Sequence, residues 1–325
     1  IKFGLPHIIK NPELVMLRHD NQVSETVDIV NNLEEHFYLK KLGNDNGLNF
    51  DEYPWWIEEN IYAENSKKIY DVYKENYKDK NKLDKILKLE FKNIYESNKE
   101  AELKKIKIVI ICHNNHYFVK QIVEKILLIN PLLKKRIILF NNYSTNLETK
   151  KYLKQIDIQV WNNTEKNSPR ITSVVNKNIF GTLDRYFILT DADLLLNDNL
   201  PSNFIEILYD ISKKYNSGKV GFALDLSDRN NFLPGSYILD NTIYQHEKKF
   251  WEKKIENEKY ELYSAYIDTT FALVDKRNLL VTCEEMECKN PIRIAGNFTC
   301  KHIPWYKPRY FPINLDNYEY IFKKS

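Results

Sequence analysis

Two aspartates interrupt an apolar stretch in the middle of the chain. Asp191 and Asp193 follow the run 186–190 and precede a second apolar run, 194–196. On an extended backbone, residues two apart point to the same face, about 6.5 Å apart, so both carboxylates would stand together where a buried strand ends. A hard divalent ion that also carries the phosphates of a substrate would offset two like charges there. The alternative is a strand that ends in a solvated acidic turn.

The elements that must position this pair form an alternating pattern from residue 104 onward. Short apolar, β-branched runs predict strands, and stretches of 3.6-residue spacing between them predict helices. Such alternation predicts an α/β fold with a mostly parallel sheet flanked by helices. The expected strands are 106–111, 136–140, 156–161, 186–190, 220–226 and 267–274, and the expected helices include 170–180, 204–211 and 243–260.

Right-handed crossovers place the carboxyl ends of parallel strands along one edge of the sheet, where ligands bind in open sheets of this kind. Asn114 follows the first expected strand, Asn142 follows the second, and the Asp191–Asp193 pair follows the fourth. The sequence therefore predicts that polar side chains from three strands meet at a single ligand-binding edge.

The chain of 325 residues is longer than one core usually requires. Residues 1–103 show helical spacing without a catalytic cluster, and residues 104–325 carry the alternating pattern. We therefore expect a helical N-terminal extension followed by the α/β domain. The role of the extension and the oligomeric state do not follow from the sequence.

Charge and hydropathy argue against two classes of partner. The 48 basic and 45 acidic residues nearly balance, and the basic residues are mostly scattered lysines, so nucleic acid is not expected as a partner. No apolar run reaches the roughly 18 residues needed to span a bilayer. Two of three Asn-x-Ser/Thr sequons lie beside the expected ligand edge, where a glycan would obstruct it, and this favours a cytoplasmic location.

The order of these features resembles one family. Residues 104–325 look like a GT-A glycosyltransferase (family-2-like) of the nucleotide-diphospho-sugar transferase superfamily. The resemblance rests on the polar loop after the first strand, the Asn-Asn-x-Ser-Thr turn at 141–145, the Asp-x-Asp motif at 191–193, the Asp-Thr-Thr-Phe segment at 268–271 and the late His-x-Pro-Trp at 302–305. It implies transfer of a sugar from a nucleotide-diphosphate donor to a hydroxyl or similar acceptor on a glycan or protein.

The resemblance also implies roles for individual residues. Asp191 and Asp193 would bind Mn2+ or Mg2+ that bridges the donor phosphates, with Asp193 the more direct ligand and His302 a further one. Asn114 and Asn142 would lie in the loops that hold the base and ribose of the donor, for which a UDP-sugar is favoured. Many relatives carry an acidic residue where this chain has Asn141 and Asn142, which weakens the choice of UDP.

Two further side chains suit the expected reaction. Arg170, in a Ser-Pro-Arg turn, would donate to the pyrophosphate, or else cap a helix at the surface. In an inverting enzyme a carboxylate takes the proton of the acceptor hydroxyl, and Asp268 is the candidate base. The alternatives for Asp268 and His302 are a strand-end cap and a core histidine.

Three other classes of protein share parts of this pattern of residues. A nucleotidyltransferase would also use paired aspartates, but it normally needs a Gly-rich loop, and residues 112–116 contain no glycine. A glycosidase needs two carboxylates on opposite sides of a bond rather than two on one strand. A non-catalytic protein that binds carbohydrate or nucleotide would have no evident use for Asp191, Asp193, Asp268 and His302 together.

Overall fold

The computed structural model describes residues 75, 80–163, 181–233, 237–238, 241–256, 258–281 and 286–307. Contacts divide the chain into two compact units, 1–102 and 103–325. The expected N-terminal extension lies mostly outside the described residues, apart from helix α6 (Lys80–Lys105), which crosses this boundary. None of the described helices is long and apolar enough to cross a membrane.

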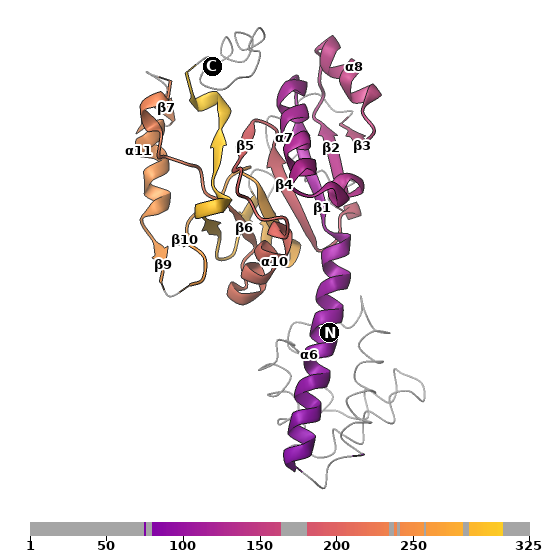
Figure 1. Cartoon of the computed structure of the whole chain (residues 1–325). Coiled ribbons are helices and arrows are strands. Elements are labelled where there is room, and N and C mark those ends of the chain that lie inside the picture. Colours follow the sequence, from indigo (N-terminus) through magenta and orange to yellow (C-terminus); the bar gives the residue numbers. More distant parts are fainter. Residues whose placement is uncertain are drawn as a thin grey trace. The chain divides into compact units, whose positions relative to one another are not determined.

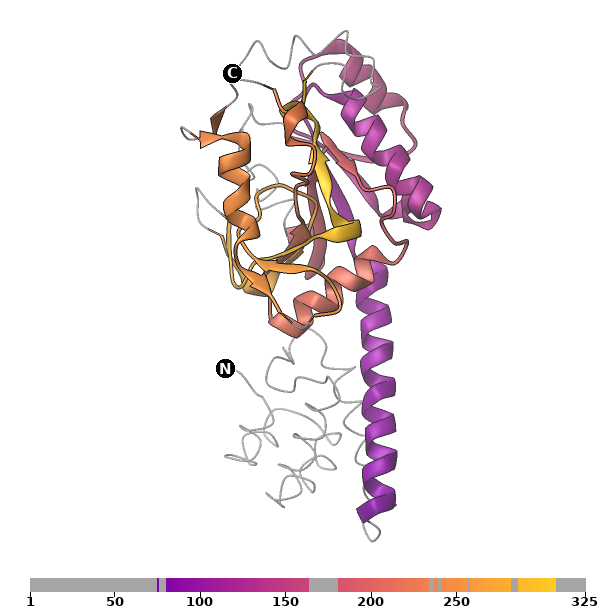
Figure 2. The same cartoon turned by 60° about the vertical axis from the view of Figure 1, so that its left-hand side comes forward.

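The second unit is built on a nine-stranded sheet (Figures 1 and 2). All strands run in one direction except β11 and β10. The predicted α/β fold with a mostly parallel sheet is therefore confirmed. In spatial order the strands are β3 (Gln159–Asn162), β2 (Ile137–Asn141), β1 (Lys107–Cys112), β4 (Tyr186–Asp191), β11 (Ala272–Asp275), β6 (Lys219–Phe222), β14 (Ile292–Ile294), β10 (Leu262–Ser264) and β9 (Lys254–Ile255).

Four further helices belong to this unit, together with three short two-stranded ladders among the described residues. The helices are α7 (His116–Ile129), α8 (Leu147–Gln155), α10 (Phe204–Tyr215) and α11 (Ile243–Lys248). The ladders pair β5 (Leu194–Leu196) with β15 (Cys300–His302), β7 (Tyr237–Ile238) with β8 (Asn241–Thr242), and β12 (Leu279–Val281) with β13 (Met286–Cys288).

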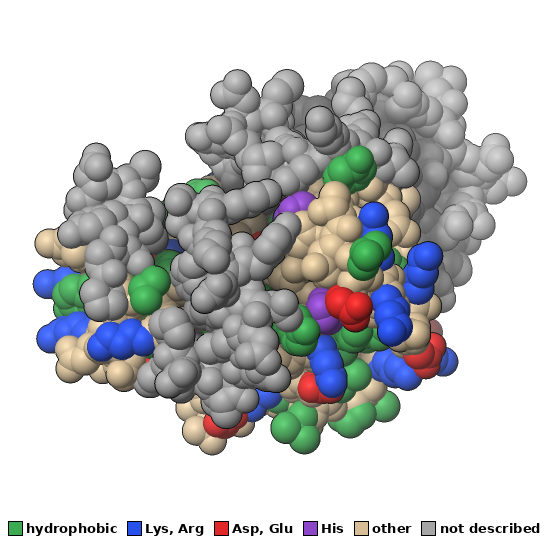
Figure 3. All heavy atoms as spheres, turned by 90° about the horizontal axis from the view of Figure 1, so that it is seen from above, with side chains coloured by type: hydrophobic (Ala, Val, Ile, Leu, Met, Phe, Trp, Pro, Cys, Tyr) green, Lys and Arg blue, Asp and Glu red, His purple; other side chains and the backbone are tan. Residues whose placement is uncertain are grey.

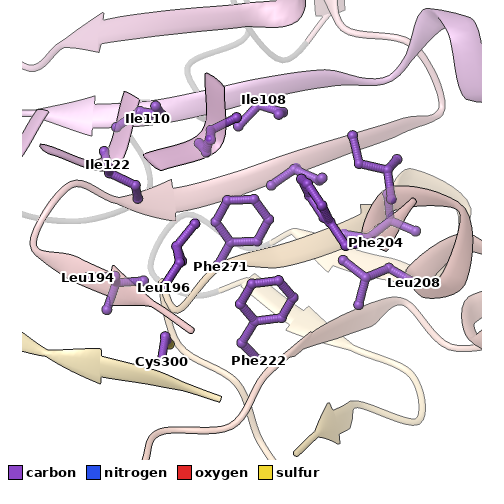
Figure 4. Packing of buried hydrophobic residues seen from close by; sticks show 14 of the residues in the cluster. Ile108, Ile110, Ile122, Leu194, Leu196, Phe204, Leu208, Phe222, Phe271 and Cys300 are labelled. Atoms are coloured by element: carbon purple, nitrogen blue, oxygen red, sulfur yellow. The ribbon is translucent and has the colours of Figure 1, made fainter. Parts of the chain in front are cut away.

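Both faces of the central strands are buried, which is why their sequences are continuously apolar. Successive residues of β1 alternate between two clusters: Ile108 and Ile110 join the larger core with α7 and α10, whereas Val109 joins a smaller core. In the larger core Phe222 of β6 stacks on Phe271, with ring centroids 4.7 Å apart (Figure 4). The aromatic packing fixes the start of β11 next to β6.

One predicted helix is wrong in extent. The expected helix 243–260 ends at Lys248, continues as a short 3-10 turn and then enters β9, which pairs with β10. Ile255 lies opposite Leu262 in that ladder. Cross-strand pairing outweighs the local preference of this charged and aromatic stretch for a helix. The expected helix 170–180 lies outside the described residues.

Surface charges are mixed on the described part of the molecule. On the face seen in Figure 3, Lys and Arg side chains lie beside Asp and Glu. This mixture agrees with the formal net charge of +3 for the whole sequence.

Candidate functional site

The acidic pair lies at the junction of two strands. Asp191 is the last residue of β4, paired with Ile111 of β1, and Asp193 directly precedes β5. Because β5 pairs with β15, His302 lies opposite Leu194 and therefore next to Asp193. The backbone N–H of Ile303 also donates to the carbonyl of Asp193 at 2.9 Å. Short β pairing thus joins residues more than a hundred positions apart in the sequence.

Asp193 and His302 form a partly buried pair. Their Oδ1 and Nε2 atoms are 3.6 Å apart, and about a quarter of each side chain is exposed. Asp193 Oδ1 and the other ring nitrogen, His302 Nδ1, are both buried without a hydrogen-bond partner. Buried polar atoms are normally bonded, so both side chains retain capacity to bind a ligand.

The donor types at this pair fit a divalent ion. Mn2+ accepts carboxylate oxygen and imidazole nitrogen, and Mg2+ commonly takes only one or two protein carboxylates together with substrate phosphates. Among the described residues, no group of three or more His, Cys, Asp or Glu side chains is arranged to hold a metal by itself.

Asp191 is held by the segment that carries Asp268. Its backbone N–H donates to the Thr269 carbonyl at 2.9 Å, and the Thr269 hydroxyl donates to its carboxylate. Burial, followed by the like charge of Asp193, raises the pKa of Asp191 to about 8, although the Thr269 hydrogen bond opposes the shift. A nearby cation would favour the ionised form of this carboxyl.

Asp191, Asp268 and His302 line one cavity of about 680 Å3. Asp268 is an exposed residue and lines this cavity. Tyr266, which is 53% exposed, and the half-buried Trp305 form apolar parts of the wall. The structure thus brings together four predicted residues from three separate segments, since Asp193 Oδ1 lies 3.6 Å from His302 Nε2 although Asp193 itself does not line the cavity.

The cavity lining also includes a buried ion pair that the sequence did not reveal. Glu247 of α11 and Arg293 of β14 are both buried and bonded to each other. Arg293 also donates to the Tyr266 carbonyl at 2.7 Å and lies over the Phe250 ring, 4.1 Å from its centroid. Burial raises the pKa of Glu247, an effect that Arg293 opposes. The position of Arg293 between two isoleucines, Ile292 and Ile294, was the one signal in the sequence that pointed to this residue.

Asn114 and Asn142 lie at the neighbouring strand ends. Asn114 adopts a left-handed backbone conformation with φ 56°, and its side-chain oxygen accepts the backbone N–H groups of Thr145 and Asn146 at 2.7 and 2.8 Å. Asn142 is buried, and its N–H donates to the carbonyl of Cys112 at 2.7 Å. These bonds tie the loop after β1 to the loop after β2. The binding roles predicted for both residues stay predictions, and Arg170 lies outside the described residues.

Three comparisons with known proteins complete these observations. No protein-family model matches the sequence, and no curated protein matches it. Solved structures do match. A glucosyl-3-phosphoglycerate synthase from Mycobacterium tuberculosis is 16% identical over 38% of this chain and 45% of its own, with a TM-score of 0.29. The mannosyltransferase PcManGT from Pyrobaculum calidifontis, in complex with GDP-Man and Mn2+, is 14% identical over 53% and 45%, with a TM-score of 0.31.

S. aureus TarS in complex with UDP-GlcNAc is 11% identical over 46% of this chain and 39% of its own, with a TM-score of 0.29. This chain thus spans less than half the length of each of these three proteins. Because the identities and TM-scores are low, the function proposed below rests on the residues of the chain itself.

Proposed function

We propose that this protein is a metal-dependent glycosyltransferase that moves a sugar from a nucleotide-diphosphate donor to a hydroxyl or similar acceptor. One observation carries the proposal: the partly buried pair Asp193–His302, which has two buried polar atoms without a hydrogen-bond partner, adjoins Asp191 at the carboxyl end of β4. A ligand crevice is expected at this edge of an open α/β sheet. The cavity beside the pair also contains a separate, exposed carboxylate, Asp268.

On the donor side, Asp193 and His302 would hold Mn2+ or Mg2+, with Asp191 next to them. The bound ion would act as a Lewis acid that neutralises charge on the leaving diphosphate. The tied loops at Asn114 and Asn142, one and two strands away from Asp191, suit the base and ribose of the donor. A UDP-sugar is the favoured donor, and Arg170 is proposed as a further donor of hydrogen bonds to its pyrophosphate.

On the acceptor side, Asp268 would serve as the general base of an inverting transfer. Its carboxylate takes the proton of the acceptor hydroxyl while the acceptor oxygen bonds to the anomeric carbon and the nucleoside diphosphate leaves. The exposed faces of Tyr266 and Trp305 suit the apolar face of a sugar ring, which favours a glycan or a glycosylated protein as acceptor.

A thermal-shift screen tests the proposal. The purified chain is heated with UDP-, GDP-, CMP- and dTDP-sugars, each in the presence of Mn2+ and of EDTA. We expect one nucleotide sugar to raise the melting temperature only with Mn2+, because a ligand that binds the native state stabilises it by mass action. Stabilisation that is equal with EDTA would contradict the metal site. No stabilisation by any donor would favour a non-catalytic binding protein.

A further inference from the structure

A lysine is buried beneath the candidate site. Lys219 begins β6 and is 2% exposed, and burial lowers the pKa of its ammonium to about 8. The ammonium donates to the carbonyl of Ile267 at 2.9 Å and also to the carbonyl of Asp268. Burying a charged group is costly unless it is well bonded, so these two carbonyls account for its retention in the sheet.

The sheet order explains why these carbonyls need a donor. β10 and β11 are consecutive along the chain but are separated in the sheet by β14 and β6. Residues 265–271 must therefore cross the ends of those two strands. The N–H of Ala265 and the carbonyls of Thr269 and Phe271 still bond to strand neighbours, whereas the carbonyls of Ile267 and Asp268 accept from Lys219. Buried backbone carbonyls without a partner are unfavourable, and Lys219 supplies hydrogen bonds from below.

The same crossover connects the two sides of the site. It presents Asp268 to the cavity, and the next residue, Thr269, bonds to Asp191 through both its carbonyl and its hydroxyl. A second point of attachment lies at Phe271, whose carbonyl accepts the N–H of Phe222 of β6 at 2.9 Å. The position of the crossover relative to β6 thus sets the positions of Asp191 and Asp268 together.

We propose that Lys219 is a positioning residue, which holds the crossover 265–271 so that Asp268 faces the cavity while Thr269 stays bonded to Asp191. This inference rests on the proposed function for its catalytic consequence. Its structural consequence, an ordered crossover over β6, is independent of that function.

The test replaces Lys219 with Met, which has a similar length but no charge or donor. A matched control is Lys276→Met, because Lys276 also donates to a backbone carbonyl, that of Leu183, but follows the far end of β11. Each variant is first checked by urea unfolding. Donor cleavage is then measured with UDP-glucose, UDP-GlcNAc and GDP-mannose in Mn2+, with water as the acceptor, so that no unidentified acceptor is needed.

We expect Lys219→Met to lower kcat by about tenfold or more, because small misplacements of reacting groups cost up to roughly a hundredfold. The dissociation constant of the donor should rise by a smaller factor than kcat falls, because Asp193 and His302, which are proposed to hold the ion, lie outside the crossover whereas Asp268 lies on it. Lys276→Met should alter neither quantity. Wild-type kcat in folded Lys219→Met, or an equal loss of kcat and donor affinity, would overturn the positioning role.

Amide hydrogen exchange provides a readout that does not depend on activity. In Lys219→Met the N–H of Asp191, bonded to Thr269, and the N–H of Phe222, bonded to Phe271, should exchange faster than in Lys276→Met. Unchanged exchange refutes the role of Lys219 even if the protein is a transferase. Wild-type protein that neither binds nor cleaves a donor refutes the proposed function instead. If Lys219→Met does not fold, Lys219→Gln, which keeps one shorter donor, should give the same changes to a smaller degree.

Discussion

Replacing Asp193 with Asn separates a ligand-binding role from a structural one. The amide keeps the shape of the side chain but lacks the charge that an ion requires. With the nucleotide sugar that stabilises the wild type, we expect the Mn2+-dependent rise in melting temperature to disappear. The reason is that Asp193 Oδ1, 3.6 Å from His302 Nε2, is one of the two protein atoms proposed to bind the ion.

The size of the effect follows from mass action. At a donor concentration of about 100 times the dissociation constant, binding stabilises the native state by about 2.7 kcal/mol, or about 5–10 °C for a domain of 150–250 residues. Loss of a charged ligand is expected to weaken binding at least as much as loss of a supporting residue, about 100-fold. The remaining stabilisation would be about 0.4 kcal/mol, or roughly 1 °C.

In the absence of the ion and the donor, Asp193→Asn is not expected to lower the melting temperature. The charge of Asp193 is, after burial, the largest cause that raises the pKa of Asp191, so the two carboxylates repel. Asp193→Asn should therefore leave the melting temperature in EDTA unchanged or higher. The matched control is Asp198→Asn at an exposed ion pair with Lys125, which should affect neither measurement. A Mn2+-dependent shift of wild-type size in Asp193→Asn would refute the site, and a large loss of stability in EDTA would show a structural role.

Three further predictions address the rest of the site. Asp268→Asn should lower donor turnover at least tenfold with donor affinity retained, measured by kinetics and calorimetry; a parallel loss of affinity would place Asp268 in the donor site. Because the folded pKa of Asp191 is raised to about 8, the native state binds an extra proton between about pH 4 and 8, and stability falls as pH rises through that window. The stability of Asp191→Asn relative to wild type, measured by urea unfolding, should therefore increase with pH, and a constant difference would contradict this. Glu247→Ala leaves Arg293 buried without its partner and should cost about 3–5 kcal/mol in urea unfolding, whereas a loss below about 1 kcal/mol would show that the pair is dispensable.

The fold was largely predictable because local patterns determine it. The strands β1, β2 and β4 are short apolar runs bounded by polar residues, and burial on both faces makes such runs visible in the sequence. The carboxyl-edge rule then predicts that Asp191 lies next to the end of β1, where the structure pairs it with Ile111. Asp191 and Asp193 were also predictable from the local pattern, because two charges that interrupt an apolar run are conspicuous in the sequence.

The second half of the sheet was less predictable because its pairing is not local. β11, β6 and β14 are each three or four residues long, too short for a periodic signal, and their order depends on contacts between distant segments. The wrong helix over 243–260 has the same origin. Its charged and aromatic composition suited a helix, but Ile255 gains a partner in Leu262 only when β10 is already in place.

The supporting charges mark the limit of sequence reasoning about this site. Glu247 and Arg293 are 46 positions apart, and Lys219 is 48 positions from Ile267, so no spacing rule relates either pair. The three charged residues, Glu247, Arg293 and Lys219, nevertheless lie within or beside apolar segments, and a buried charge requires a partner. Arg293 and Lys219 both bond to the crossover 265–271, which forms part of the cavity wall: Arg293 to the carbonyl of Tyr266 and Lys219 to that of Ile267. The carboxylates proposed to bind the ligand can thus be predicted from the local sequence, whereas the groups that fix their geometry follow from the crossing of β14 and β6 by residues 265–271.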